Sequence, residues 1–128
     1  MPVSSENFEF TVSGTDVVQL THDNDSSTLS RTSNKLKGDG YYGRADGFHT
    51  VQYNISGNAD NTFTGDIEIQ ATLAVEPAET DWFVVSGTAQ TYTESYGSYM
   101  FNFTGNYVWI RAKLVYTAGS VSSIVLNH

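Results

Sequence analysis

Histidines are the first side chains to consider for chemistry, and this chain has three of them: His22, His49 and His128. No two are spaced so that one strand or one helical turn would bring them together, as a metal site requires. His49 falls on the apolar side of an alternating segment, where a hydrogen-bonded core histidine is favoured over a metal ligand. We therefore expect no metal site built on histidine.

Oxygen ligands suited to a hard cation such as calcium occur together in Asp23-Asn24-Asp25-Ser26. The stretch lacks the glycine and the distal glutamate that make a calcium-binding loop recognisable. The alternative is a solvated turn, because Asp, Asn and Ser side chains bond neighbouring backbone amides. We favour the turn and predict neither a metal ion nor another cofactor, while a cation held by Asp23 and Asp25 stays an open alternative.

A pair of carboxylates, Asp66 and Glu68, lies two residues apart on one face of an expected strand. Two carboxylates at a fixed separation are what a glycoside hydrolase uses. The same spacing arises on any strand that faces water, and no third group singles this pair out. The sequence also has no G-x-S-x-G motif, phosphate loop or dinucleotide fingerprint. We predict that the chain is not an enzyme and has no catalytic residues.

Aromatic side chains are more informative, with eight tyrosines, seven phenylalanines and two tryptophans. Tyr41 and Tyr42 lie in a Gly-rich segment, and Tyr92 and Tyr96 lie in an expected loop from Gln90 to Ser98. Tyrosine in such loops is typical of contact surfaces, because it offers area and a hydroxyl at low entropic cost. The alternative is that tyrosines cover the ends of a core. Core packing is favoured for Tyr53, Tyr107 and Tyr116.

One segment near the end of the chain combines aromatic and basic side chains in a single row. If residues 107–116 form a strand, alternate side chains face opposite sides. The expected core side holds Val108, Ile110, Ala112, Leu114 and Tyr116. The opposite side holds Tyr107, Trp109, Arg111, Lys113 and Val115. We expect Arg111 to pair with a carboxylate or to stack on Trp109, and this row to be covered by another chain or by the Gly-rich segment.

Strands must position these side chains, because no stretch has apolar residues at helical spacing for more than about one turn. Turn residues recur about every 8–12 positions, as in β-sandwiches and barrels. Residues 8–12 and 17–20 are expected to form a hairpin around Ser13-Gly14, and Thr117 to Ser120 to join the last two strands. The other expected strands are at 28–32, 48–55, 66–75, 82–85, 99–103, 107–116 and 121–126.

The clearest strand pattern runs from Asp66 to Val75. One side holds the residues predicted to be buried together: Ile67, Ile69, Ala71 and Leu73. Gln70 lies on the other side and is predicted to face water. Replacing Leu73 by Ala is then expected to cost about 2–5 kcal/mol, and replacing Gln70 no more than about 0.5 kcal/mol.

The segment from His22 to Gly47 is polar, Gly-rich and short of apolar periodicity. We expect a long excursion with one short strand near Thr28 to Thr32. We also expect it to be the most mobile part of the isolated protein and to become ordered against a partner.

These patterns predict an all-β protein: an antiparallel β-sandwich, jelly-roll-like, with about eight strands in a single domain over residues 1–128. Six basic and fourteen acidic residues give a net charge of −8. We therefore expect no nucleic-acid or membrane partner, because phosphate contacts need clustered Lys and Arg. The chain has no cysteine, no signal-peptide pattern and no long apolar run, so we expect a soluble protein made in a reducing cytoplasm.

The segment from Asp81 to His128 resembles a known group of proteins. It contains DWF, a Tyr/Ser/Gly-rich stretch and then FNFTGNYVWIRAKLVYTAGSVSSIVLNH. This pattern resembles the C-terminal portion of small β-rich virion proteins of tailed bacteriophages, particularly contractile-tailed phages of aquatic bacteria. The resemblance implies a structural part of the particle without catalysis. A receptor-binding fibre would normally carry a shaft, and no fibrous repeat is present.

We therefore predict a non-catalytic structural component of a phage particle, in the capsid, neck, tail or baseplate, made in the host cytoplasm and located in the virion. The expected partners are other virion proteins and copies of the chain itself, with a host-surface glycan as a further candidate. The alternative is a carbohydrate-binding β-sandwich module. The residues expected to make the contacts are Tyr41, Tyr42, Tyr92, Tyr96, Tyr107, Trp109 and Arg111.

Overall fold

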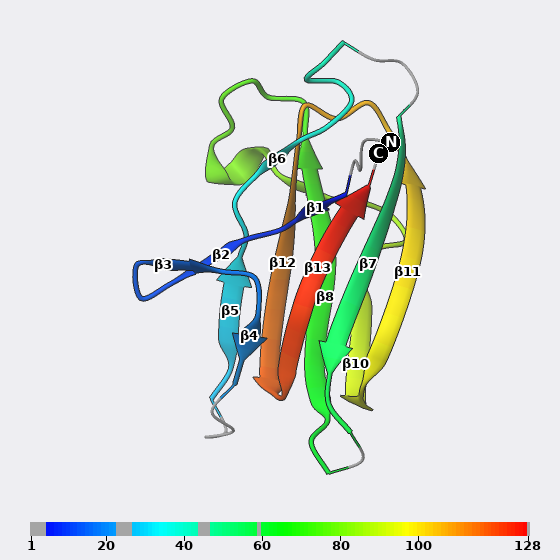
Figure 1. Ribbon diagram of the computed structural model, residues 1–128. Coiled ribbons are helices and arrows are strands. Elements are labelled where there is room, and N and C mark those ends of the chain that lie inside the picture. Colours follow the sequence, from blue (N-terminus) through cyan, green and yellow to red (C-terminus); the bar gives the residue numbers. More distant parts are fainter. Residues whose placement is uncertain (1–4, 23–26, 44–46, 59, 128) are drawn as a thin grey trace.

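The structure is a computed structural model that describes residues 5–22, 27–43, 47–58 and 60–127. Two antiparallel sheets face each other (Figure 1). The five-stranded sheet contains β1 (Glu6–Asn7), β4 (Leu20–Thr21), β7 (Phe48–Ser56), β11 (Gly97–Thr104) and β13 (Ser120–Asn127). The six-stranded sheet contains β5 (Leu29–Thr32), β6 (Leu36–Lys37), β8 (Phe63–Thr72), β9 (Phe83–Val84), β10 (Gln90–Ser95) and β12 (Trp109–Ala118). The remaining elements are a hairpin of β2 (Phe10–Val12) and β3 (Thr15–Val17) and a 3-10 turn, η1 (Glu79–Asp81).

Eight of these strands have the connectivity of a jelly roll. One sheet has the order β4-β13-β7-β11 and the other β5-β12-β8-β10. The short strands β1, β6 and β9 pair with β13, β12 and β8, so they extend these two orders. The predicted antiparallel jelly-roll sandwich is therefore confirmed. That residues 1–128 form one domain stays a prediction.

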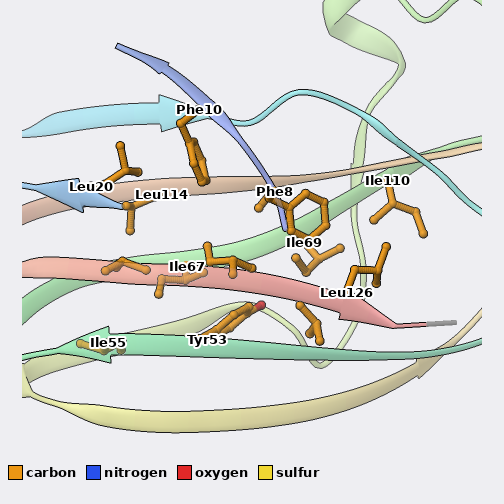
Figure 2. Close-up of a cluster of buried hydrophobic side chains, with 14 of the residues drawn as sticks. Phe8, Phe10, Leu20, Tyr53, Ile55, Ile67, Ile69, Ile110, Leu114 and Leu126 are labelled. Atoms are coloured by element: carbon orange, nitrogen blue, oxygen red, sulfur yellow. The ribbon is translucent and has the colours of Figure 1, made fainter. Parts of the chain in front are cut away.

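The core lies between the two sheets, where the inward side chains of β7 and β13 meet those of β8 and β12 (Figure 2). The alternation predicted for β12 is confirmed for Ile110, Ala112, Leu114 and Tyr116, which are at most 1% exposed. Val108, also expected in the core, lies before the first residue of β12 and is only half-buried. Tyr53 crosses the core from β7, and its hydroxyl donates to the carbonyl of Thr88 at 2.8 Å. Burial of this phenol raises its pKa above the ordinary value.

Both tight turns expected from the sequence are confirmed, although the second strand of the first hairpin is Thr15–Val17 and not residues 17–20, and Leu20 belongs to β4. Ser13 and Gly14 have φ of 52° and 80°, the positive values that a two-residue hairpin turn between β2 and β3 requires. Gly119 joins β12 to β13 with φ of +89°. A Cβ at this position would lie 2.5 Å from the Cα of Phe63, so the turn leaves no room for a side chain.

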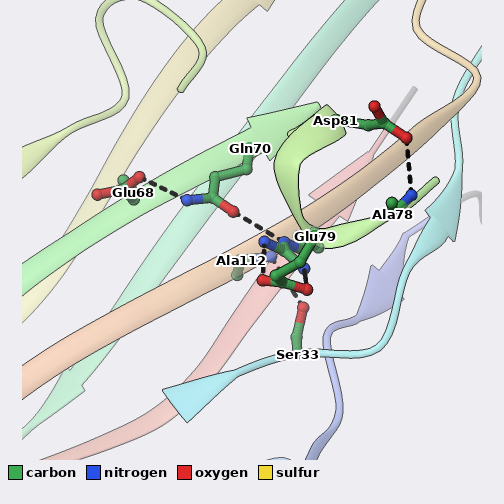
Figure 3. Close-up of polar contacts among 8 residues, drawn as sticks. Ser33, Glu68, Gln70, Ala78, Glu79, Asp81 and Ala112 are labelled. Carbon is green, nitrogen blue, oxygen red and sulfur yellow. Dashed lines mark hydrogen bonds and ion pairs between the residues drawn. The ribbon is translucent and has the colours of Figure 1, made fainter. Parts of the chain in front are cut away.

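The prediction for the end of β8 was wrong at two residues. β8 ends at Thr72, the last residue paired with β12, so Leu73 lies beyond the sheet with 69% of its surface exposed. Gln70, expected to face water, is only 8% exposed. The connection from β8 to β9 folds back over this outer side of the sheet, and Glu79 of η1 lies there on Arg111 (Figure 3).

The expectation of a long excursion from His22 to Gly47 was also wrong in part. The predicted strand near Thr28 to Thr32 is confirmed as β5, but β6 follows it and both pair with β12. The amide of Ser33 between them donates to the carbonyl of Ala112 at 2.9 Å. Two short strands of this segment therefore belong to the six-stranded sheet. Asp23 and Asp25 lie outside the described residues.

Candidate functional site

The outer side of β12 and the turn that follows β6 form the candidate site. Trp109 is the first residue of β12 and is paired in register with Lys37 of β6. Its indole Nε1 donates to the carbonyl of Val75 at 2.9 Å, which fixes the ring at the end of the sheet. Because facing residues of two paired strands point to the same side, Lys37 and Trp109 share the outer side of the sheet.

The turn after β6 presents two tyrosines beside this ring. The amides of Gly38 and Gly40 donate to the carbonyls of Val108 and Tyr107, both at 2.9 Å. A Cβ on Gly38 would lie 2.2 Å from the carbonyl oxygen of Tyr107, so only glycine allows the turn to lie this close to the chain before β12. The turn therefore holds Tyr41 and Tyr42 against the end of the six-stranded sheet.

Five side chains meet at this place and are called the Tyr41 cluster: Lys35, Lys37, Tyr41, Tyr42 and Trp109. The Tyr41 ring lies 5.0 Å from the Trp109 ring and 5.5 Å from the Tyr42 ring, measured between centroids. The ammonium of Lys35 lies 4.9 Å from the Trp109 ring, and that of Lys37 lies 4.6 Å from the Tyr41 ring. Tyr41 and Tyr42 remain 45% and 48% exposed. The cluster is thus a held aromatic surface with one ammonium over the Trp109 ring and one over the Tyr41 ring.

Arg111, two residues further along β12, is bound within the chain. Its Nε donates to the Gln70 side-chain oxygen at 2.8 Å, and its two terminal nitrogens donate to the Glu79 carboxylate at 2.8 and 3.2 Å (Figure 3). The guanidinium also lies 4.3 Å from the Trp82 ring. This bidentate pair lowers the pKa of the Glu79 carboxyl, first through the hydrogen bonds and then through the charge of Arg111. The predicted pairing with a carboxylate is confirmed, whereas the aromatic partner is Trp82 and not Trp109.

The other predicted contact residues lie elsewhere. The expectation that Tyr92 lies in a loop was wrong, because Gln90–Ser95 is the strand β10 and alternation turns Tyr92 into the core. Tyr92 is 7% exposed, and its burial raises its pKa to about 12. Tyr96 is 49% exposed at the opposite end of the sheets from the Tyr41 cluster. Tyr107 is half-buried against Phe103.

Sequence reasoning missed an apolar hollow of about 610 Å³ next to the end of β8. Its walls include Leu73, Phe83, Val84 and Tyr107. Phe83 is 71% exposed and Val84 50% exposed. The signal was present in the sequence, since Leu73 and Val75 continue the apolar alternation of β8 past the point where β12 begins.

The described part of the chain was also considered for a metal site, a membrane helix and a pair of catalytic carboxylates. That part contains no group of three His, Cys, Asp or Glu residues arranged to hold a metal ion. Within the same residues, no helix has the length and apolarity that a membrane crossing needs. Of the two carboxylates considered for hydrolysis, Glu68 accepts a hydrogen bond from Gln70 and faces Lys113 across the strands, and Asp66 faces Val115.

Comparisons with known proteins identify a fold and no family. No family model and no curated protein matches the chain. Among solved structures it is similar to the C-terminal CBM6 module of the laminarinase LamC from Zobellia galactanivorans, at 9% identity and a TM-score of 0.49, over 97% of this chain and 99% of that one. The family 32 module of NanJ from Clostridium perfringens, in complex with galactose, matches at 14% identity and a TM-score of 0.45, over 99% and 93%.

A third match is the isomalto-dextranase of Arthrobacter globiformis T6, complexed with panose. It has 12% identity and a TM-score of 0.51, over 98% of this chain and 23% of that one. This chain therefore spans under a quarter of that enzyme chain. At this identity the likeness shows a shared β-sandwich fold.

Proposed function

We propose that the chain is a non-catalytic carbohydrate-binding module and that the Tyr41 cluster is its sugar-binding surface. The observation that carries the proposal is the pair of exposed tyrosines, Tyr41 and Tyr42, held beside Trp109 at one end of the sandwich. Jelly-roll folds serve many unrelated functions, so the fold permits this function and the side chains of the cluster argue for it.

The geometry of the cluster suits a sugar ring. A pyranose has an apolar face of C–H groups, and an aromatic ring offers a matching flat apolar surface with a polar tip. Tyr41 is held between the Trp109 ring, the Tyr42 ring and the Lys37 ammonium, so it loses little conformational freedom when a ligand binds. The Lys35 and Lys37 ammonium groups and the tyrosine hydroxyls can then donate hydrogen bonds to sugar oxygens.

The direct test is to screen the full chain against a panel of oligosaccharides and to measure the affinity for those it retains. Tyr41→Ala is expected to weaken binding about tenfold or more, because it removes the stacking surface. A tenfold change in affinity corresponds to about 1.4 kcal/mol in the free energy of binding. Tyr96→Ala is the matched control, being the same substitution at a similarly exposed tyrosine at the other end of the sheets. Retention of no oligosaccharide, or equal losses for the two variants, would overturn the proposal.

A second candidate function is a structural role in a phage particle. It is supported by the resemblance of residues 81–128 to virion proteins and by one structural observation. The apolar hollow at Leu73, Phe83 and Val84 exposes large hydrophobic side chains beside one another, as surfaces that bind protein do. On this account Phe83→Ser lowers incorporation of the chain into particles while its melting temperature is unchanged. Purified particles of the phage that encodes the chain, found to lack the protein, would remove this candidate.

A further inference from the structure

Basic residues are gathered in one short part of an otherwise acidic chain. Four of the six lie in the stretch from Arg31 to Arg44, which holds a single acidic residue, Asp39. The chain as a whole has a net charge of −8. The Asp39 side chain is only 2% exposed, and its carboxylate accepts the amide of Gly47 at 3.0 Å. By sequence this stretch is therefore a positive segment of a negatively charged protein.

Two of these basic side chains, Lys35 and Lys37, lie beside the aromatic rings of the Tyr41 cluster. Leu36 between them is only 9% exposed, so alternation along the chain turns both lysines to the outer side of the sheet. Their ammonium groups lie 4.9 Å from the Trp109 ring and 4.6 Å from the Tyr41 ring. Neither ammonium forms an ion pair with a carboxylate in the described part of the chain. Both charges can therefore act on a ligand that lies on the rings.

The other basic side chains of the described residues are paired or lie elsewhere. Arg111 forms its ion pair with Glu79, and Lys113 faces Glu68 across the paired strands β12 and β8. Arg31 lies on the inner side of β5, because it is paired in register with a fully buried leucine of β12. Among the described residues, the cations that face outward without an acidic neighbour in the sheet are therefore the two lysines of the Tyr41 cluster.

We propose that the Tyr41 cluster is specific for an acidic carbohydrate, in which the sugar rings carry carboxylate or sulfate groups. This inference rests on the proposed carbohydrate binding and names the class of sugar. A sugar ring lies on Tyr41, and the Lys35 and Lys37 ammonium groups donate charge-assisted hydrogen bonds to its anionic group. The net charge of −8 repels an acidic ligand elsewhere, so such a ligand gains affinity where cations are gathered.

The rings and the lysines have different parts in this binding. The aromatic rings supply contact area to any sugar, whereas the two charges distinguish an acidic sugar from a neutral one. Both lysines are exposed, so each is expected to contribute only about two- to fivefold to the affinity. The contribution is expected to fall as salt screens the charges.

Pairs of oligosaccharides that differ only in charge test this proposal on the full chain. Cello-oligosaccharides and oligoglucuronates of the same linkage differ in that a carboxylate replaces a hydroxymethyl group. Sulfated oligosaccharides and their desulfated counterparts form the second arm, which distinguishes sulfate from carboxylate. We expect the acidic member of at least one pair to bind more tightly. We also expect its affinity, measured by calorimetry, to fall between about 50 and 500 mM salt.

Variants of the two lysines locate the effect. Lys37→Gln is expected to weaken binding of the acidic member about two- to fivefold, and Lys35→Gln combined with it about fivefold or more. The neutral member is expected to be affected less. Lys113→Gln is the matched control, because it removes the same charge from β12 further along the sheet. Lys37→Arg keeps the charge and is expected to keep the dependence on salt, which separates the charge from the packing of the side chain.

The outcomes separate this inference from the proposed function. Binding of neutral oligosaccharides with no preference for an acidic member, weakened by Tyr41→Ala, would overturn the inference and leave the sugar-binding function in place. Binding of no oligosaccharide in either arm or in the wider panel would overturn both. Equal effects of Lys37→Gln and Lys113→Gln on the acidic ligand would also overturn the inference, because the preference would then come from the overall charge.

Discussion

At the scale of single residues, Arg111 shows how a charged side chain on a strand can form its hydrogen bonds and its ion pair within its own chain. The sequence placed it in a row with Trp109 and Lys113, and this row had the composition of a contact surface. In the structure Gln70, Glu79 and Trp82 surround the guanidinium. The sequence could not show this, because Glu79 reaches Arg111 only when the connection from β8 to β9 folds over the sheet.

The first prediction concerns Gln70, whose side-chain oxygen accepts the Nε–H of the buried Arg111. Gln70→Ala leaves that donor without its partner, which is expected to cost about 1–3 kcal/mol in the free energy of unfolding. Gln19→Ala, at an exposed glutamine, is the control and is expected to cost less than about 0.5 kcal/mol. Urea unfolding of both variants measures this, and equal small costs would mean that Gln70 does not support Arg111.

The second prediction concerns the pH dependence of the Arg111–Glu79 pair. The pKa of Glu79 is lowered in the folded chain, so the stability it contributes is present above the unfolded-state pKa and is lost as the pH falls through the lowered value. Glu79→Gln should therefore melt below the wild type at neutral pH, and the gap should close in acid. Thermal melts from pH 7 downward test this, with the exposed Glu76→Gln as control. A gap that stays constant would contradict the pairing.

At the scale of strands, the period of two predicted most of the sandwich correctly. The inward residues of β12 from Ile110 onward and the turn at Ser13-Gly14 are where the alternation and the turn residues placed them. β10 was missed because Thr, Glu and Ser in Gln90–Ser95 look like loop residues, although Thr91-Tyr92-Thr93 is a strand-like alternation. The end of β8 was also missed, because an apolar pattern does not reveal where the neighbouring strand stops.

The third prediction compares two large apolar residues of the same pattern, one inside the sheet and one beyond it. Ile69 is fully buried, and Ile69→Ala is expected to cost about 2–5 kcal/mol in the free energy of unfolding. Leu73 lies past the last residue of β8, and Leu73→Ala is expected to cost less than about 0.5 kcal/mol. Chemical denaturation measures both values. Similar costs would show that β8 continues beyond Thr72.

The fourth prediction concerns the segment that the sequence favoured as mobile. The amides of Ser33 and Gly38 donate to the carbonyls of Ala112 and Val108, so their hydrogen exchange is expected to be slow. The exposed turn at Gly14 gives the fast reference within the same molecule. Exchange measured by NMR decides this, and fast exchange at both Ser33 and Gly38 would mean that the β5–β6 segment does not stay paired with β12.

At the scale of the whole molecule, aromatic rings and charges are distributed unevenly. The Tyr41 cluster lies at one end of the six-stranded sheet, and the three long strands of the five-stranded sheet, β7, β11 and β13, contain no Asp, Glu, Lys or Arg. The net charge and the aromatic content follow from the composition alone. The gathering of aromatic side chains at one end of the six-stranded sheet could not be predicted from it, because β6 and β12 are about seventy residues apart in the chain and become neighbours only in the sheet.

The central claim is that a sugar binds at the Tyr41 cluster, and the chain's two tryptophans allow a direct measurement. The Trp109 indole N–H lies in the cluster and donates to Val75, whereas the Trp82 ring lies on Arg111. An NMR titration with a retained oligosaccharide is expected to shift the Trp109 indole signal and the amides of Tyr41 and Tyr42, and to leave the Trp82 indole signal in place. Saturable binding that leaves the Trp109 signal and both tyrosine amides unmoved would contradict the account.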